Sequence, residues 1–250
     1  MAGHSKWANR QHRKGRQDAV RGKAFSRCSR EIIVAARSGG GNPEINNRLR
    51  LAIQEARGVN MPADTIERAI KRGTGELEGT SYEEVTYEGY GPGGVALMIR
   101  ALSDNRQRTV ADVRSILNKR GGRMAEAGGV AYLFEPKGVI FVDRSAAEED
   151  TLMEAVLDAG AEDVLADEEQ FEVRTAPSDF QAVRDAVEAA GIETSSAELT
   201  MVPATTMPVR DDQARSLLKL LEELDDQEDV QQVYANFEVD DALLAEATKN

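Results

Sequence analysis

The sequence predicts an α+β protein that has an N-terminal three-helix domain followed by two α/β domains, the second inserted in the first. Up to about residue 73, apolar residues recur every three or four positions, which is the period of amphipathic helices. Beyond residue 80 the pattern changes to the alternation typical of strands. Between residues 139 and 202 the predicted elements follow the order β-α-β-β-α-β, so we expect the two α/β domains to be ferredoxin-like.

The domain boundaries follow from changes in period and composition. We expect a flexible basic arm at 1–17, a helical domain at 18–75, a discontinuous α/β domain at 80–136 plus 206–250, and an inserted ferredoxin-like α/β domain at 137–205. The arm contains almost no apolar side chain apart from Trp7. It cannot bury a face of its own, so it is predicted to become ordered only when bound.

Glycines and capping residues divide the helical domain into three helices. The first helix ends at a run of three glycines. Asn42, followed by a proline, is typical of a helix cap and first turn, so the second helix is predicted over 43–57 with Ile45 facing inward. The third helix is predicted over 62–72, with Ala63 on its inner face.

The discontinuous domain is predicted from segments that lie far apart in the chain. Its first elements are two strands around a Gly-Pro-Gly-Gly turn, then a helix and a further strand, at 84–90, 95–102, 109–120 and 130–134. A helix at 211–224 and a strand at 230–239 close the sequence and have no partners of their own. We therefore expect these two elements to complete the sheet that the first strands begin.

Charge is distributed unequally along the chain, which has a net charge of −13. Residues 1–75 hold sixteen Lys and Arg against six Asp and Glu, whereas residues 76–250 hold fifteen against thirty-eight. A basic front end on an acidic body predicts a polyanionic partner that touches one end of the molecule, and nucleic acid is the commonest such partner. The acidic α/β domains are expected to face away from it, where they could meet a protein partner.

The candidate nucleic-acid-binding residues fall into three groups. The arm supplies cations for phosphate, an indole for base stacking and an imidazole donor: Lys6, Trp7, Arg10, His12, Arg13, Lys14 and Arg16. The first helix continues the charge as a basic stripe of Arg21, Lys23, Arg27 and Arg30. A later helix and its flanks add Arg106, Arg108, Lys119 and Arg120. The alternatives are a solvated basic tail, a Trp7 packed on the helices, and a later helix that is simply solvated.

Residues for catalysis are scarce. Both histidines lie in the arm, and the single cysteine, Cys28, lies on an apolar helical stripe, where a buried inert thiol is expected. No spacing typical of a zinc site or a serine-hydrolase elbow occurs, so we expect no enzymatic activity, no metal and no cofactor. The lone cysteine and the absence of an apolar run of roughly 20 residues favour a cytoplasmic protein without a membrane partner.

Several stretches resemble the YebC family: Met1–Asn9 with His12-Arg13-Lys14, Asn60–Gly75, Tyr87–Ala96, Asp104–Arg114, Lys119–Gly122, Tyr132–Gly138 and Asp229–Val239. The resemblance runs from end to end. It implies a helical N-terminal domain with two α/β domains and no enzymatic activity. The family is described as DNA-binding transcriptional regulators, whereas related members activate translation or relieve stalled ribosomes.

Three functions therefore follow as hypotheses. The first is a translation factor whose arm contacts ribosomal RNA, in the manner of basic extensions that RNA orders. The second is a DNA-binding transcriptional regulator, in which the second and third helices would imitate a helix-turn-helix. The third, an enzyme acting on nucleic acid, is disfavoured by the sparse catalytic residues. We expect a non-enzymatic regulator of gene expression and favour RNA as its target.

Overall fold

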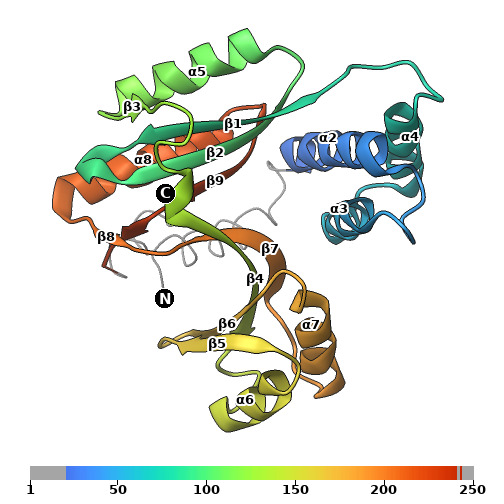
Figure 1. Ribbon diagram of the computed structural model, residues 1–250, viewed down its shortest axis with the longest axis vertical. Helices are drawn as coiled ribbons and strands as arrows, with labels where there is room; N and C mark the ends of the chain where they lie inside the picture. The colour runs from blue at the N-terminus through green and yellow to red at the C-terminus, as the bar shows by residue number, and fades with distance from the viewer. Residues whose placement is uncertain (1–20, 241–242, 244–250) are drawn as a thin grey trace.

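The computed structural model describes residues 21–240 and residue 243, and its ribbon is drawn in Figure 1. Three helices form a helical domain at the right of the view: α2 (Arg21–Gly39), α3 (Asn47–Gly58) and α4 (Ala63–Thr74). Two four-stranded antiparallel sheets, each covered by helices, make up the rest of the molecule. The predicted α+β class is confirmed, with the second α/β unit inserted in the first. The predicted arm lies outside the described residues.

Asn46 decides where α3 begins. Its side chain accepts a hydrogen bond from the backbone N–H of Leu49 at 3.0 Å, which is a helix N-cap. The same amide donates to the carbonyl oxygens of Ala35 and Gly40, both at 2.8 Å, and so joins the end of α2 to the start of α3. The predicted cap at Asn42 is therefore wrong. Ile45 lies before the helix and is 81% exposed, instead of facing the core.

The helix α4 packs closely against α2. Pro62 takes the position before its first turn, and Ala63 is exposed rather than inward as predicted. Gly73 allows the close approach: a Cβ built there would lie 2.5 Å from the carbonyl oxygen of Ile33 and 2.6 Å from the Cβ of Ala36. The two backbones can cross at this distance only because residue 73 has no side chain.

Gly73→Ala is expected to destabilise the protein by about 1–3 kcal/mol, because the added methyl forces two packed helices apart. The free energy of unfolding from urea titration measures the effect. Gly58→Ala is the matched control: Gly58 is also helical, and a Cβ there meets nothing within 4 Å. We expect the control to be neutral or slightly stabilising, since alanine favours helix. Equal effects of the two changes would contradict the close-packing argument.

The middle domain is built on a sheet whose strand order is β3-β1-β2-β9. Its strands are β1 (Glu83–Tyr90), β2 (Ala96–Ser103), β3 (Arg123–Met124) and β9 (Val230–Ala235), and its helices are α5 (Arg106–Lys119) and α8 (Asp211–Asp226). The predicted strand at 230–239 is thus interrupted at Asn236, after which β10 (Phe237–Glu238) pairs with β8 (Met207–Pro208). The pairing of β9 with β2 joins segments separated by about half of the chain.

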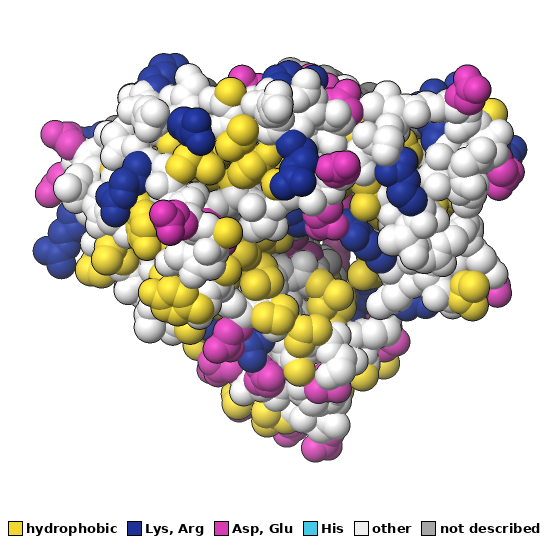
Figure 2. All heavy atoms as spheres, turned by 45° about the horizontal axis from the view of Figure 1, so that its top comes forward, with side chains coloured by type: hydrophobic (Ala, Val, Ile, Leu, Met, Phe, Trp, Pro, Cys, Tyr) yellow, Lys and Arg dark blue, Asp and Glu magenta, His cyan; other side chains and the backbone are white. Residues whose placement is uncertain are grey.

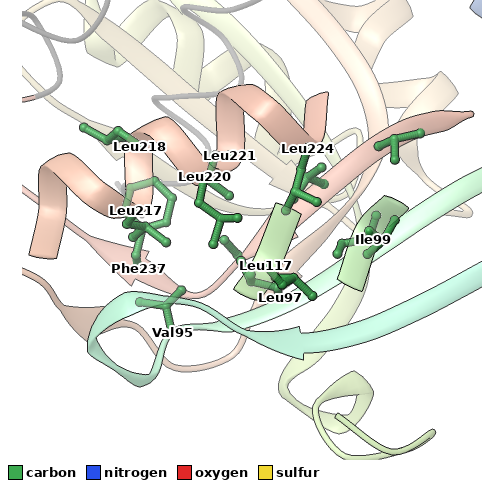
Figure 3. Close-up of a cluster of buried hydrophobic side chains, with 14 of the residues drawn as sticks. Val95, Leu97, Ile99, Leu117, Leu217, Leu218, Leu220, Leu221, Leu224 and Phe237 are labelled. Carbon is green, nitrogen blue, oxygen red and sulfur yellow. The ribbon is translucent and has the colours of Figure 1, made fainter. Parts of the chain in front are cut away.

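One face of this sheet carries the largest core of the molecule. Alternate residues of β2, Leu97 and Ile99, point toward α5 and α8 and are fully buried. Figure 3 shows the leucines of α8 packed over these strand residues, with Leu117 entering from α5. Four leucines of α8 are completely inaccessible: Leu217, Leu220, Leu221 and Leu224. The predicted inward face of this helix is therefore the one that the structure buries.

The other face of the middle sheet is covered by a loop that Glu88 holds in place. Its carboxylate accepts hydrogen bonds from the backbone N–H groups of Gly128, Val130 and Ala131 at 2.6, 2.7 and 2.9 Å. Burial raises the pKa of Glu88, but these three hydrogen bonds outweigh burial and leave the pKa below its usual value. A strand over 130–134 was predicted and is wrong. In a strand, these backbone N–H groups would donate to a neighbouring strand, but here they donate to the Glu88 carboxylate. Residues 131–133 form a 3-10 turn.

The inserted domain follows β3 and precedes α8, and it has the predicted order β-α-β-β-α-β. Its elements are β4 (Phe134–Asp143), α6 (Glu149–Leu157), β5 (Ala161–Ala166), β6 (Gln170–Thr175), α7 (Phe180–Ala189) and β7 (Ser196–Pro203). The strand order β5-β6-β4-β7 is that of a ferredoxin-like sheet. Both helices pack on one face through a core that includes Phe171 and Phe180. The residue boundaries proposed above for the domains stay predictions.

Candidate nucleic-acid interface

The three predicted groups of binding residues have different positions relative to the described chain. The arm residues Lys6, Trp7, Arg10, His12, Arg13, Lys14 and Arg16 lie outside the described residues, as does the side chain of Arg21. The other basic residues of α2 and those of α5 and its flanks are described. As nucleic-acid contacts, all of them stay predictions.

The basic stripe of α2 packs against the acidic turn between α8 and β9. Lys23 Nζ lies 2.8 Å from Asp226 Oδ1, and Arg27 Nη2 lies 3.0 Å from Asp225 Oδ1. Both cations also donate to the backbone carbonyl oxygen of Asp225. Arg30 Nη2 lies 2.6 Å from Glu228 Oε1, and the Arg30 side chain is only 8% exposed. The stripe therefore attaches the helical domain to the middle domain.

Asp229 is the buried centre of this attachment. Its side chain is 1% exposed and accepts hydrogen bonds from Thr109 Oγ1 at 2.6 Å and Arg108 Nη2 at 2.8 Å. Arg30 Nη1 lies 3.5 Å from its second oxygen. Burial raises the pKa of Asp229. The hydrogen bonds from Thr109 and Arg108 and the charge of Arg30 lower that pKa by more than burial raises it, so the net pKa lies below its usual value.

A second ionic cluster crosses the same boundary. Arg48 of α3 pairs with Glu31 of α2 at 2.7 Å and with Glu84 of β1 at 2.9 Å. Arg100 of β2 pairs with the same two carboxylates, at 2.6 and 2.5 Å. Burial raises the pKa of Glu84, yet hydrogen bonds and charge from Arg100 and Arg48 leave it lowered. Each carboxylate contacts both cations, so the four charges fix the orientation of the helical domain against the middle domain.

The predicted cations of α5 and its flanks are also paired with acids. Arg106 lies 3.9 Å from Glu83, and Arg108 contacts Asp104 at 2.8 Å as well as Asp229. Lys119 lies 3.2 Å from Glu223 of α8, which Arg120 also contacts. Glu223 is a single carboxylate shared by two cations, so this end of α5 keeps a net positive charge.

Other cations, outside the three predicted groups, have no carboxylate partner among the residues described. They are Arg37, Arg50, Arg57, Arg72, Arg114, Arg123, Arg184, Arg210 and Lys219. Arg123 instead lies over the ring of Tyr90, 4.7 Å from its centroid. Figure 2 shows most of the visible Lys and Arg side chains in the upper part of the molecule, where Asp and Glu side chains lie among them. Arg37, Arg114 and Arg123 continue the basic groups that the sequence shows, and the i, i+7 spacing of Arg50 and Arg57 is the signal that could have marked those two.

The described residues offer little to a reaction centre. Cys28 is buried, and burial together with the charge of Glu55 raises the pKa of its thiol to about 12, which keeps it protonated. Within 21–240 and 243, no group of three or more His, Cys, Asp or Glu is placed to hold a metal ion. Across the same residues, no helix is long and apolar enough to cross a membrane.

Comparison with known proteins identifies the family. The sequence model of the TACO1/YebC N-terminal domain matches residues 5–76, and that of the TACO1/YebC second and third domains matches residues 82–237. The chain belongs to the TACO1/YebC family. The resemblance seen in the sequence is thereby confirmed for this TACO1/YebC protein.

Relatives of this TACO1/YebC protein match it over nearly their whole length. A protein of Persephonella marina is 54% identical over 246 residues, which is 98% of each chain, and one of Acidithiobacillus ferrooxidans is 55% identical over 245 residues, also 98% of each. Both are called probable transcriptional regulatory proteins. The crystal structure of a conserved hypothetical protein from Aquifex aeolicus matches with a TM-score of 0.80 and 49% identity, over 89% of this chain and 92% of that one.

Proposed function

We propose that this protein is a nucleic-acid-binding regulator of gene expression whose N-terminal arm contacts phosphate groups of ribosomal RNA. It acts in this proposal as a translation factor that relieves stalled ribosomes. The observation that carries the proposal is the composition of residues 1–17, which hold five Lys or Arg and no acid in a chain of net charge −13. Such a segment binds phosphate by charge and by release of counterions.

The pairing of the described cations supports the leading role of the arm. In α2, Lys23, Arg27 and Arg30 are matched by acids of the middle domain, which lowers the positive charge that they offer to a polyanion. The same pairs bring α2 against the middle domain. In this proposal the basic stripe serves mainly to join two domains, and the arm supplies the charge for the polyanion.

A DNA-binding transcriptional regulator is the second candidate, and it is favoured by the relatives, which are called probable transcriptional regulatory proteins. A helix that reads DNA presents side chains to the bases of the major groove. In α4, Arg68 and Lys71 are instead paired with Asp64 and Glu67 one turn earlier in the same helix, both at 2.6 Å. This pairing supports RNA over a helix-turn-helix that uses α4.

We also propose that the protein acts by binding and not by catalysis. Its two histidines lie at positions 4 and 12, and the thiol of Cys28 is buried and protonated. A general base or nucleophile needs an accessible group whose pKa lies near the working pH. The buried thiol of Cys28 does not meet that need.

Sedimentation of cell lysate through a sucrose gradient tests the proposed function. We expect the full-length protein to migrate with ribosomes at low salt and to leave them as salt rises, because phosphate contacts depend steeply on ionic strength. A variant lacking residues 2–17 is the control and should stay at the top of the gradient. Full-length protein that stays at the top, together with sequence-selective shifts of promoter DNA, would favour the transcriptional candidate.

A further inference from the structure

The face of α3 that points away from the core carries a row of polar side chains. Their spacing of three, four and three residues places them on one side of the helix, and they are Asn47, Arg50, Gln54 and Arg57. The opposite side holds the buried residues Leu49, Ala52, Ile53 and Ala56. The row is therefore a fixed surface of the helical domain, presented by a helix whose other side is anchored.

The two arginines of this row have no carboxylate to neutralise them within the described part of the chain. Arg50 Nη2 donates to Asn47 Oδ1 at 2.6 Å, which orients the guanidinium and leaves its charge uncompensated. Arg57 is exposed and has no partner among the described residues. Seven residues of helix separate the two cations by about 10 Å along the axis. Arg68 and Lys71 on the neighbouring helix are, in contrast, both paired.

The inserted domain adds a third cation beside the row. Arg184 of α7 reaches Gln54, with 3.4 Å between Nη1 of the arginine and Oε1 of the amide. Arg184 also lacks a carboxylate partner among the residues described. Figure 1 shows α7 below α3, and Figure 2 shows dark-blue side chains along the hollow between the helical domain and the rest of the molecule. Cations from two domains thus face one junction.

We propose that this α3 row, together with Arg184, binds an unpaired strand of RNA. The three guanidinium groups contact successive phosphates, and the amides of Asn47 and Gln54 hydrogen-bond to base edges, which are accessible only in unpaired nucleotides. The inference rests on the proposed function, since it gives the RNA a second contact besides the arm.

The position of α7 decides between a single strand and a duplex. The major groove of DNA is about 12 Å wide and admits one helix, whose reading face must be free of neighbours. The contact of Arg184 with Gln54 brings a side chain of a second helix onto the reading face of α3. A duplex cannot pass between the two helices, whereas a flexible strand can lie along the junction.

Binding of a fluorescent oligouridine to the full-length protein tests the site. For Arg50→Ala/Arg57→Ala/Arg184→Ala we expect roughly a 100-fold loss of affinity near 0.1 M salt. We also expect the slope of log affinity against log salt to fall by about 2, since each phosphate contact on a single strand contributes about 0.7. The matched control is Arg68→Ala/Lys71→Ala/Lys137→Ala, which removes the same charge from paired cations of the same two domains. The control should change both quantities much less.

The outcomes separate this site from the proposed function. Wild-type protein that fails to bind oligouridine would overturn both. Wild-type protein that binds, with equal losses in the α3-row variant and the control, would overturn the site alone and leave the arm as the contact. A row variant that loses affinity for duplex DNA as much as for oligouridine would overturn the single-strand assignment. Surface changes of this kind alter stability within about 0.5 kcal/mol, so unfolding curves verify that each variant folds.

Discussion

Deleting residues 2–17 is expected to lower the affinity for RNA on the order of 10³-fold near 0.1 M salt. The deletion removes five cations, Lys6, Arg10, Arg13, Lys14 and Arg16, and with them the positive charge that no neighbouring acid in the sequence offsets. Five phosphate contacts on a single strand should also reduce the salt slope by about 3 to 4. Fluorescence anisotropy with a labelled ribosomal RNA fragment, repeated at several salt concentrations, measures both quantities.

Two variants sharpen this test. A chain in which residues 2–17 are shuffled keeps the charge and should keep most of the affinity if the arm binds by charge alone. Trp7→Ala should cost about 1–3 kcal/mol of binding if the indole stacks on a base, and nothing if it does not. The deleted chain should unfold at the same urea concentration as the full chain. Unchanged affinity after the deletion would contradict the proposed role of the arm.

Asp229→Ala is expected to destabilise the protein by about 3–5 kcal/mol. The substitution removes a carboxylate that is 1% exposed, and it leaves Arg30, itself 8% exposed, without that partner. It also removes the acceptor for Thr109 and Arg108. Breaking a buried pair by removing one partner is costly because the other charge stays buried. Asp226→Ala is the matched control: the Asp226 side chain is 72% exposed in its pair with Lys23, and its loss should cost at most about 1 kcal/mol.

The effect of Asp229→Asn should depend on pH in a definite direction. The folded pKa of Asp229 is lowered, so the stability contributed by its charge is complete above the unfolded value of about 3.9. That contribution is lost as pH falls through the lower folded pKa. The difference in free energy of unfolding between wild type and Asp229→Asn should therefore shrink below about pH 4. A difference that grew on acidification would mean that Asp229 is not held ionised in the folded state.

Much of the architecture could be predicted because it depends on local period. The strand at 170–175 and the leucine face of α8 lie where the alternation and the helical repeat place them. The insertion could also be inferred, since the last helix and strand had no partners of their own and β9 pairs with β2. Turn and cap positions were less predictable. Asn46 rather than Asn42 caps α3 because it also reaches back to Ala35 and Gly40, a contact that capping preference alone does not contain.

The candidate interface, too, could be predicted from the sequence only in part. Lys23, Arg27 and Arg30 look like a free basic stripe in the sequence, yet their acidic partners follow about two hundred positions later, with Lys23 and Asp226 203 positions apart. Arg50 and Arg57 look ordinary in the sequence, yet neither meets a carboxylate among the residues that the structure describes. A count of charges cannot separate these cases, because neutralisation depends on which segments meet.

The sequence by itself determined the types of most elements, the insertion of one α/β domain in the other, and the segregation of positive charge toward the N-terminus. These depend on periodicity and composition, which are properties of neighbouring residues. Only the tertiary structure decided which of the described cations meet a carboxylate, and that a side chain of α7 reaches the exposed face of α3. Ion pairing and the access of a partner depend on distances in space between segments far apart in the chain, and no local pattern encodes those distances.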